Sequence, residues 1–588
     1  MATPVIGPVI APVVNLPFNV PMQPLPGIVM KLFAAAVNAA GIMDFQETGT
    51  GSASVSHAAD VYAPDHEGVY RKFGENEVVW AGGRVVRNLF PDLLTCATTY
   101  YTNFAGRTLI AGAGPNGEDV IRHTATAAAT SMNLRQRDTT VYGTYLIARV
   151  LVRPVGQNMT MKLTVGNGSV SQGGEGPGWL ASVPLVADQW HDVTTWARND
   201  TWAYRDVLFQ DPTTEDDIVV DIVRDGFQLE DATGRADLST PSEYIPAETV
   251  HVFNYQNGNS VLNSVVTESQ GEPIDPPPAL QYYPDCTNAQ IHSNDLANAV
   301  WVPTNLTPLK NAVGITGKKD EATTLTATAA NGVVIANAVT AASNTHAAKW
   351  YLKRKTGSGV VECTLDGGTT WTDITSQLSA AFSEVVVDQA ALSNPQIGVR
   401  IVTSGDEVVV GNAELHLDKS SAKVNGTSPI FTAASAASVD RTVYTFDVGN
   451  LTETGCIYFD TDGSMLPSID TSTLIHYIRF NSSKCGIERV SNSFLGFRDL
   501  SGRLNGGAVG DWGNLSSVGA AYAVNTGERG ITDNVTGYWE ESSTFAGFSP
   551  DYFEIGYQSV YPFTLSNLQI WSTSDYSSAK AKITELMA

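Results

Sequence analysis

Residues 145–152 read YLIARVLV, a run of strand length in which apolar side chains dominate and no helical period appears. Residues 159–165 (MTMKLTV) alternate in the same way. Runs of this kind recur along the chain, at residues 217–223, 398–402, 407–410 and 442–448. Turn-forming Gly, Asn, Asp and Pro separate them, which is typical of antiparallel strands. The sequence therefore predicts an all-β protein in which, from residue 49 onward, only residues 577–587 (SSAKAKITELM) form a helix.

Length and composition fit a series of sandwiches. A chain of 588 residues exceeds one hydrophobic core and indicates three or four domains. The 52 Gly and 28 Pro favour short strands joined by tight turns, and charged residues make up only 16%. The net charge of −25 would repel phosphate backbones, so nucleic acid is excluded as an expected partner.

The five cysteines are few, scattered and odd in number. They include no CxxC pair, so neither a disulfide framework nor a zinc site is predicted. We expect small buried hydrophobic side chains in a chain made in a reducing cytoplasm. Cys456 and Cys485 fall in one predicted module and could be strand neighbours.

The first 43 residues differ from the rest. Lys31 is the single charge among residues 1–38, and seven prolines precede residue 27. Proline at this density excludes a membrane helix and favours an extended segment, and the basic start of a secretory signal is missing. Residues 27–43 could form a short helix. We expect the segment to anchor the protein to a larger particle, with a disordered leader as the alternative. The residues expected to dock are Pro4, Pro8, Pro12, Pro17, Phe18 and Pro21.

Three stretches resemble a family of modular bacteriophage tail-fibre and appendage proteins. Residues 55–89 contain Ala58-Ala59-Asp60-Val61-Tyr62, Glu67-Gly68-Val69 and Arg87-Asn88-Leu89, which match the N-terminal block of that family. Residues 226–246 (GFQLEDATGRADLSTPSEYIP) resemble the end of its carbohydrate-binding-type sandwich, a buried last strand whose tail folds back. A second, weaker copy begins at residues 296–301 (LANAVW), and residues 412–417 (NAELHL) stand where its QLE would be. Residues 429–460 and 568–586 are similar to a concanavalin A-like, or laminin-G-like, sandwich.

The Pro-rich run at residues 271–280 (GEPIDPPPAL) and the turn cluster at 425–429 mark boundaries. With the resemblance, they predict jelly-roll sandwiches in series after an extended anchor. The expected segments are 1–43 (anchor), 44–95 (adaptor), 96–250 (first sandwich), 251–284 (linker), 285–425 (second sandwich) and 426–588 (concanavalin A-like sandwich).

The resemblance implies a non-enzymatic virion protein that is made in the host cytoplasm and assembles as a homotrimer. Its expected partners are other virion proteins (tail, portal or capsid) and host surface polysaccharide, without membrane insertion. The alternatives are a head fibre or capsid decoration protein and, from another class, a virion glycan depolymerase.

Aromatic side chains in loops are the candidate sugar platforms, because pyranose faces stack on aromatic rings. Each could equally serve packing or a subunit interface. Trp190, Trp196 and Trp350 stand in strand-like contexts and are expected in cores. The candidates are Trp179, Trp202, Tyr204, Trp512, Tyr538 and Trp539.

No catalytic or cofactor-binding pattern is found. Residues 364–371 (TLDGGTTW) have the form of an Asp-box, and a single copy predicts a structural hairpin. Asp460 and Asp462 could bind calcium, but a simple Asp-Gly turn is the preferred interpretation. Residues 112–117 (GAGPNG) lack the Lys-Ser/Thr of a phosphate loop and indicate a hairpin. HExxH, GxSxG and ExDxxE are all missing.

Overall fold

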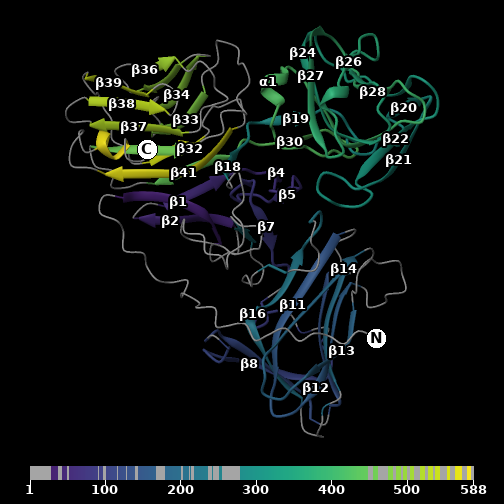
Figure 1. The fold of residues 1–588 in the computed structure, drawn as a ribbon, viewed down its shortest axis with the longest axis vertical. Helices are drawn as coiled ribbons and strands as arrows, with labels where there is room; N and C mark the ends of the chain where they lie inside the picture. Colours follow the sequence, from purple (N-terminus) through teal and green to yellow (C-terminus); the bar gives the residue numbers. More distant parts are fainter. Residues whose placement is uncertain are drawn as a thin grey trace.

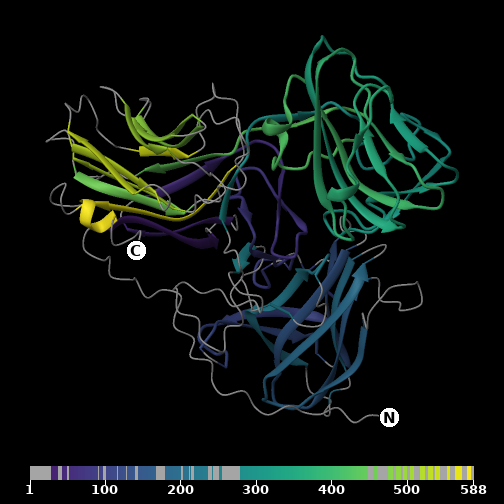
Figure 2. The same ribbon diagram turned by 45° about the horizontal axis from the view of Figure 1, so that its top comes forward.

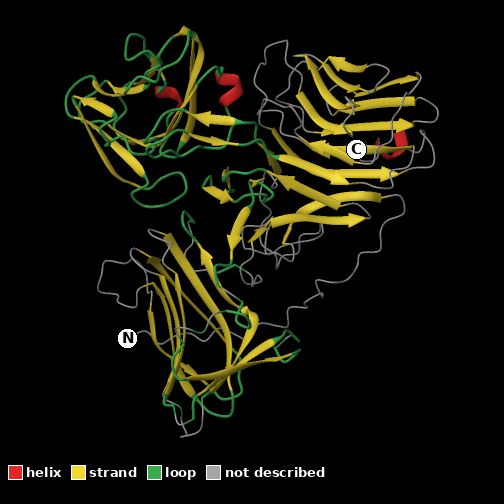
Figure 3. Cartoon of the chain, turned by 180° about the vertical axis from the view of Figure 1, so that it is seen from behind, coloured by secondary structure: helices red, strands yellow, loops and turns green. Residues whose placement is uncertain are grey.

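A computed structural model of the chain describes residues 28–37, 43–49, 52–253 apart from short gaps (the longest 167–178), and 279–447. Beyond residue 447 it describes the strands and residues 579–583. Nearly every described element is a strand in an antiparallel sheet (Figure 3). The exceptions are a 3₁₀ turn at Thr375–Gln377, α1 at Ser421–Val424 and a helical turn at residues 579–583. The protein is therefore built of all-β sandwich modules with a short C-terminal helix, as predicted.

The first module is a sandwich of two sheets around one core. Along β11 the apolar positions Leu146, Ala148, Val150 and Val152 are buried, because alternate residues of a strand face the same side. One sheet has the order β10-β15-β12-β13 and the other β14-β11-β16-β9-β8. The strands are β8 (Phe104–Ile110), β9 (Val120–Ala125), β10 (Ser131–Asp138), β11 (Thr144–Pro154), β12 (Met159–Gly166), β13 (Trp179–Leu185), β14 (His191–Asn199), β15 (Ala203–Gln210) and β16 (Val219–Asp231).

The second module has the same two-sheet plan. Its core is built around Trp301 and Trp350, whose ring centroids lie 6.1 Å apart. The sheet orders are β20-β23-β28-β25-β26 and β21-β22-β29-β24-β27. The strands are β20 (Trp301–Thr304), β21 (Leu306–Ala312), β22 (Ala322–Ala327), β23 (Gly332–Ala336), β24 (Asn344–Thr356), β25 (Val361–Thr364), β26 (Thr372–Asp373), β27 (Ser383–Leu392), β28 (Gly398–Ile401) and β29 (Glu407–His416).

The third lobe combines the first described strands with those of the C-terminal part of the chain (Figures 1 and 2). One of its sheets has the order β2-β1-β41-β32-β37-β38-β39, and the other β3-β31-β40-β33-β34-β35-β36. The strands are β1 (Ile28–Val37), β2 (Met43–Gly49), β3 (Ser52–Ser56), β31 (Val443–Asp447), β32 (Thr454–Asp460), β33 (Ile475–Phe480), β34 (Cys485–Ser491), β35 (Phe494–Arg498), β36 (Arg503–Ala508), β37 (Ser517–Ala523), β38 (Glu528–Asp533), β39 (Gly537–Ser542), β40 (Tyr552–Ile555) and β41 (Phe563–Ser572).

This lobe corrects three expectations. Lys31 of β1 pairs with Gln569 of β41, so residues 28–37 form a strand of the C-terminal lobe and not a helix of a separate segment. Val55 of β3 pairs with Tyr444, which moves part of the expected adaptor into the same lobe. Cys456 and Cys485 lie in different sheets and are not strand neighbours. Residues 1–27 lie outside the described residues, and so do the linker residues 254–278.

Short ribbons connect the lobes. They are β4 (Val61–Pro64) with β5 (Tyr70–Phe73), β7 (Arg84–Arg87) with β17 (Val250–Phe253), β19 (Cys286–Asn288) with β30 (Ala437–Val439), and β6 (Trp80–Ala81) with β18 (Ala279–Tyr282), which also pairs with β41. The chain therefore enters and leaves each sandwich module through a pair of neighbouring strands.

Candidate functional site

The two inserted modules repeat one framework, and the hydrogen bonds at their bases give the equivalence residue by residue. The leading strand of each module bonds to its last long strand: Leu89 N–H donates to Leu229 O, and Ala289 N–H donates to Leu415 O. The leading strand also pairs with the closing strand, Val86 with His251 and Cys286 with Val439. Position 86 is therefore equivalent to 286, and position 229 to 415.

A buried asparagine holds each leading strand in place. Asn88 Oδ1 accepts bonds from the N–H groups of Phe90 and Leu229, both at 3.0 Å. Asn288 Oδ1 accepts the equivalent pair, from Gln290 and Leu415, also at 3.0 Å. Both side chains are at most 1% exposed, so the framework satisfies these backbone donors where water cannot reach them.

A buried carboxylate then clamps the returning tail of the first module. Glu230 Oε1 accepts bonds from Gln228 Nε2 at 2.6 Å and from Ser242 N at 2.5 Å. Its Oε2 pairs with Arg235 at 2.9 Å. The expectation that residues 226–246 form a buried last strand with a tail that folds back is confirmed for the described part of that stretch.

The second module clamps its tail with different chemistry. Glu414 Oε1 accepts a bond from Ile430 N at 3.1 Å, and its Oε2 lies 3.4 Å from Lys349 Nζ. The stretch NAELHL does occupy the place of QLE. The register refines this match, because Glu414 is equivalent to Gln228, and His416 to Glu230. The second module thus has its carboxylate, Glu414, where the first has Gln228. It has an imidazole, His416, where the first has the carboxylate Glu230.

The imidazole links that carboxylate to a thiol. His416 Nε2 lies 2.9 Å from Glu414 Oε2, and His416 Nδ1 lies 3.3 Å from Cys286 Sγ. All three side chains are at least 96% buried. A thiol, an imidazole and a carboxylate in this order form a nucleophile, a base and a group that orients the base.

Electrostatics favours the charged form of the pair. Burial alone would raise the pKa of the Cys286 thiol, but the charge and hydrogen bond of His416 outweigh it, so this pKa is lowered. Burial alone would lower the pKa of His416, but Cys286 and Glu414 raise it to about 9. Both shifts favour the charged forms, a thiolate and an imidazolium, over the neutral pair.

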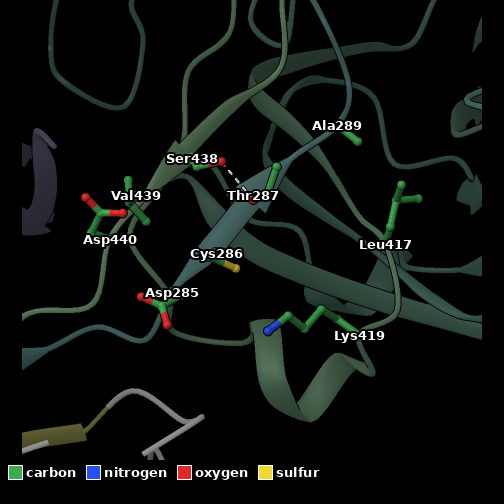
Figure 4. A pocket seen from close by; sticks show the side chains of 9 residues that line it. All are labelled: Asp285, Cys286, Thr287, Ala289, Leu417, Lys419, Ser438, Val439 and Asp440. Carbon is green, nitrogen blue, oxygen red and sulfur yellow. Dashed lines mark hydrogen bonds between the residues drawn. The ribbon is translucent and has the colours of Figure 1, made fainter. Parts of the chain in front are cut away.

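Cys286 also lines a pocket of about 440 Å³ between β19, β30 and the chain that follows β29 (Figure 4). Figure 4 shows the sulfur on the side of β19 on which Lys419 lies. The pocket carries charges of both signs, with Lys419 on one side and Asp285 and Asp440 on the other. The remaining lining residues are Thr287, Ala289, Leu417, Ser438 and Val439.

Two of the aromatic candidates stand in one sheet of the first module, on the strands either side of β12. Trp179 of β13 pairs with Thr164 of β12, and Tyr204 of β15 pairs with Gly166, two residues further along β12. These positions alternate with the buried pair Leu163 and Val207 of the core.

The other candidates are not joined to this pair. Tyr538 and Trp539 are neighbours on β39 of the C-terminal lobe. The remaining candidates lie outside the described residues: Trp202, Trp512 and the anchor residues Pro4, Pro8, Pro12, Pro17, Phe18 and Pro21.

Three tryptophans were expected in cores, and the expectation holds fully for one. Trp350 is completely buried. Trp190 and Trp196 are partly exposed. Trp190 lies beneath the Arg153 guanidinium at 5.0 Å, and Trp196 packs near Tyr145 with ring centroids 6.5 Å apart. Trp196 alternates along β14 with the buried Val193 and Thr195 and so faces the outer side of its sheet, and Trp190 directly precedes β14.

Two hairpin predictions are confirmed. In residues 364–371, Asp366 accepts bonds from Thr370 N–H and Thr364 Oγ1, and Trp371 Nε1 donates to Gly368 O at 2.9 Å. Gly368 has a φ of +90°, which requires glycine. The described residues of 112–117 lie in the turn between the paired strands β8 and β9. Asp460 lies in β32 and Asp462 outside the described residues.

The sequence interpretation missed the Cys286–His416–Glu414 group. The sequence predicts small buried hydrophobic side chains for the cysteines; Cys363 in the apolar core fits this, whereas Cys286 is buried but contacts His416. Glu414 and His416 are two residues apart on a strand and so share a face, which was a readable signal. His416 contacts Cys286, which lies 130 residues earlier in the sequence, and no local sequence pattern indicates this contact.

Comparisons with known proteins give little. No protein-family model and no curated protein matches the chain. Among solved structures, the N-terminal tandem CBM22 domain of Xyn10C from Paenibacillus barcinonensis aligns over 57% of this chain and 98% of its own, with 10% identity and a TM-score of 0.18. Recombinant pro-11S globulin of pumpkin aligns over 57% and 86%, with 8% identity and a TM-score of 0.12. Scores this low carry no argument. The sheets themselves show the architecture alone, antiparallel two-sheet sandwich modules.

Two searches of the described residues were negative. None of the helices there has the length and apolar character to cross a membrane. The same part of the chain holds no cluster of three or more His, Cys, Asp or Glu side chains placed for a metal ion.

Proposed function

We propose that this chain is a structural and adhesive component of a bacteriophage virion, a tail-fibre or other appendage protein that contributes to attachment to host-surface glycans. One observation carries the proposal: two sandwiches of one plan are inserted, each through a paired leading and closing strand, into a lobe built from residues 28–56 and the C-terminal strands. This construction holds whole modules out on short ribbons, which suits display of binding surfaces.

Close backbone contact supports a fixed arrangement of the modules. Gly317 of the second module, with φ +81°, approaches Gly234 of the first so closely that a Cβ would lie 2.8 Å from the Gly234 Cα. Gly234 itself packs against Val69, and Tyr62 N–H donates to Ser428 Oγ at 2.8 Å. Three segments distant in sequence thus meet at one junction, which keeps the modules from swinging freely.

The positions of Trp179 and Tyr204 support a glycan surface on the first module. They stand in β13 and β15, on either side of β12, at positions that alternate with the core residues Leu163 and Val207. Aromatic positions gathered on one sheet suit stacking against sugar rings. In this proposal the protein binds glycan without cleaving it.

Binding of purified full-length protein to immobilised capsular polysaccharide and lipopolysaccharide tests the adhesive role. Replacing Trp179 and Tyr204 together with Ala should weaken retention at least tenfold, because each stacking contact contributes about 1 kcal/mol. The matched control is Trp190→Ala in the same module, which should bind like the wild type. If the double variant were retained as strongly as the wild type, Trp179 and Tyr204 would not be part of the glycan-binding surface. Release of new reducing ends would favour the depolymerase alternative.

The position of the protein on a particle tests the virion role. Antibody labelling of purified particles should place it on the tail or an appendage. Labelling on the capsid would favour the head-fibre alternative, and absence from particles would refute the virion proposal altogether.

A further inference from the structure

Both modules hold the returning tail against the last long strand with a buried carboxylate, but only the second has a thiol and an imidazole at this place. In the first module the equivalent positions hold Val86, Gln228 and Glu230, and the tail is still clamped. The fold therefore needs two buried side chains that hydrogen-bond to each other, at positions 228 and 230 in the first module and at 414 and 416 in the second. It does not need a cysteine that contacts that pair, so Cys286 and His416 are free to serve another purpose.

The geometry around the sulfur suits a nucleophile. Its partner His416 lies at 3.3 Å, and the partner of His416, Glu414, lies at 2.9 Å. Glu414 is held in turn by Asn412 Nδ2 at 2.9 Å and by Ile430 N. The imidazole is therefore fixed in orientation by a carboxylate that cannot easily turn away. By contrast, Cys363 of the same module lies in the apolar core, where burial raises the pKa of its thiol.

The pocket supplies room for a reactant and indicates its charge. Cys286 belongs both to the hydrogen-bonded chain and to the pocket wall (Figure 4). Lys419 could pair with a carboxylate, and Asp440 with an ammonium group, whereas Asp285 already pairs with Arg441 at 2.8 Å. Opposite charges on two sides of a small pocket fit a zwitterion of amino-acid size.

We propose that Cys286 is a covalent attachment site at which a small zwitterionic disulfide of the cystine class exchanges with the thiolate. The Cys286 sulfur attacks one sulfur of the disulfide, the bond between the two ligand sulfurs breaks, and a Cys286–ligand disulfide forms. The other half leaves as a thiolate with the electron pair and is protonated in solvent. Cys286 is oxidised and the departing half is reduced, so no further oxidant is needed.

The charged groups around the sulfur define the expected pH dependence. They are His416 and Glu414 on β29, Lys349 on β24, and Lys419, Asp285 and Asp440 around the pocket. An ordinary thiol loses about a hundredfold of its reactivity between pH 8 and pH 6, because its thiolate fraction falls about tenfold per unit. A thiolate held by an imidazolium keeps most of its reactivity over that range.

Incubation of the folded full-length protein with cystine, followed by mass spectrometry of each cysteine peptide, tests the proposal. Cys286 should form the mixed disulfide, and its rate at pH 6 should stay within about tenfold of the rate at pH 8. Cys363 serves as the internal control and should remain unmodified. Absence of an adduct on Cys286 before denaturation would overturn the proposal.

Two variants and two further probes make the result specific. His416→Gln imitates the amide that the first module uses beside its carboxylate, so it should fold, and its rate at pH 6 should fall at least about tenfold. An unchanged rate at pH 6 would show that His416 does not activate the Cys286 thiol. Cys286→Val copies Val86 and confirms the site of the adduct. Cystamine, a dication, and dithiodiglycolate, a dianion, should both react more slowly than cystine, and equal rates would refute the zwitterion preference.

Discussion

At the scale of single residues, buried charges in this protein are matched by partners on neighbouring strands. Asp221 is completely buried on β16, and Arg122 Nε and Arg153 Nη2 lie 2.8 and 2.6 Å from its two oxygens. Burial would raise the pKa of Asp221, but the bonds from the two arginines lower it below 3.8. The alternation of residues 217–223 was readable from the sequence, whereas the partners of Asp221 were not, because they lie 68 and 99 residues away.

Replacing Asp221 with Asn should destabilise the first module by about 2 kcal/mol, since it leaves two half-buried arginines without their anion. The native pKa of Asp221 is depressed, so its contribution is present above the unfolded value of about 3.8. That contribution is lost as the pH falls through the lower native value. Hydrogen exchange of β9 and β16 as a function of pH measures both effects.

The control is Asp192→Asn, at a pair with Arg149 in which the carboxylate is 42% exposed. Exposed pairs contribute little, so we expect a loss of about 0.5 kcal/mol or less. An effect as large as that of Asp221→Asn would contradict the role of burial.

At the scale of elements, the last strand and the returning tail act as one unit in each module. Both the last strand ending in QLE and the tail that folds back were expected from the family resemblance of residues 226–246. The bond that fixes the tail, from Ser242 N to Glu230, could not be read from the sequence. A strand pattern gives the face on which Glu230 lies, but not which backbone group comes to rest against it.

Replacing Ser242 with Pro removes the N–H that donates to Glu230 at 2.5 Å. A buried carboxylate oxygen without its donor costs about 1–3 kcal/mol, so the tail should detach more readily. Limited proteolysis beyond residue 232 should become faster than in the wild type. Ser242→Ala keeps the N–H and loses only the 3.1 Å hydroxyl bond, so it should stay close to the wild type. Equal cleavage of both variants would show that the backbone bond is unimportant.

At the scale of the whole molecule, the order of modules along the chain is not their order in space. Residues 28–37 and 563–572 are neighbours in one sheet, although more than five hundred residues separate them in sequence. The expected anchor segment therefore has two parts with different roles. Residues 28–37 cover an edge of the C-terminal sheet, while the docking function proposed for residues 1–27 stays a prediction.

Two truncations separate these roles. Removal of residues 1–27 should leave the thermal unfolding of the protein unchanged and abolish its incorporation into particles. Removal of residues 1–42 also deletes β1 and uncovers β41, so it should lower the unfolding temperature and promote aggregation through the exposed strand edge. Incorporation of the shorter deletion would contradict the anchor, and an unaltered unfolding temperature of the longer one would contradict the role of β1.

The sequence by itself determined the strand-rich class, its division into sandwich modules and the structural hairpins, because these depend on local alternation and on turn-forming residues; the tail that folds back was indicated by the family resemblance. Only the tertiary structure decided that β1 and β3 complete the C-terminal lobe, that the two modules share one framework, and that Cys286 meets His416. Strand partners are chosen by edges and faces that come together in folding, over separations that no local pattern encodes. The run YLIARVLV therefore predicted a strand correctly, while its neighbours β14 and β16 emerged only with the fold.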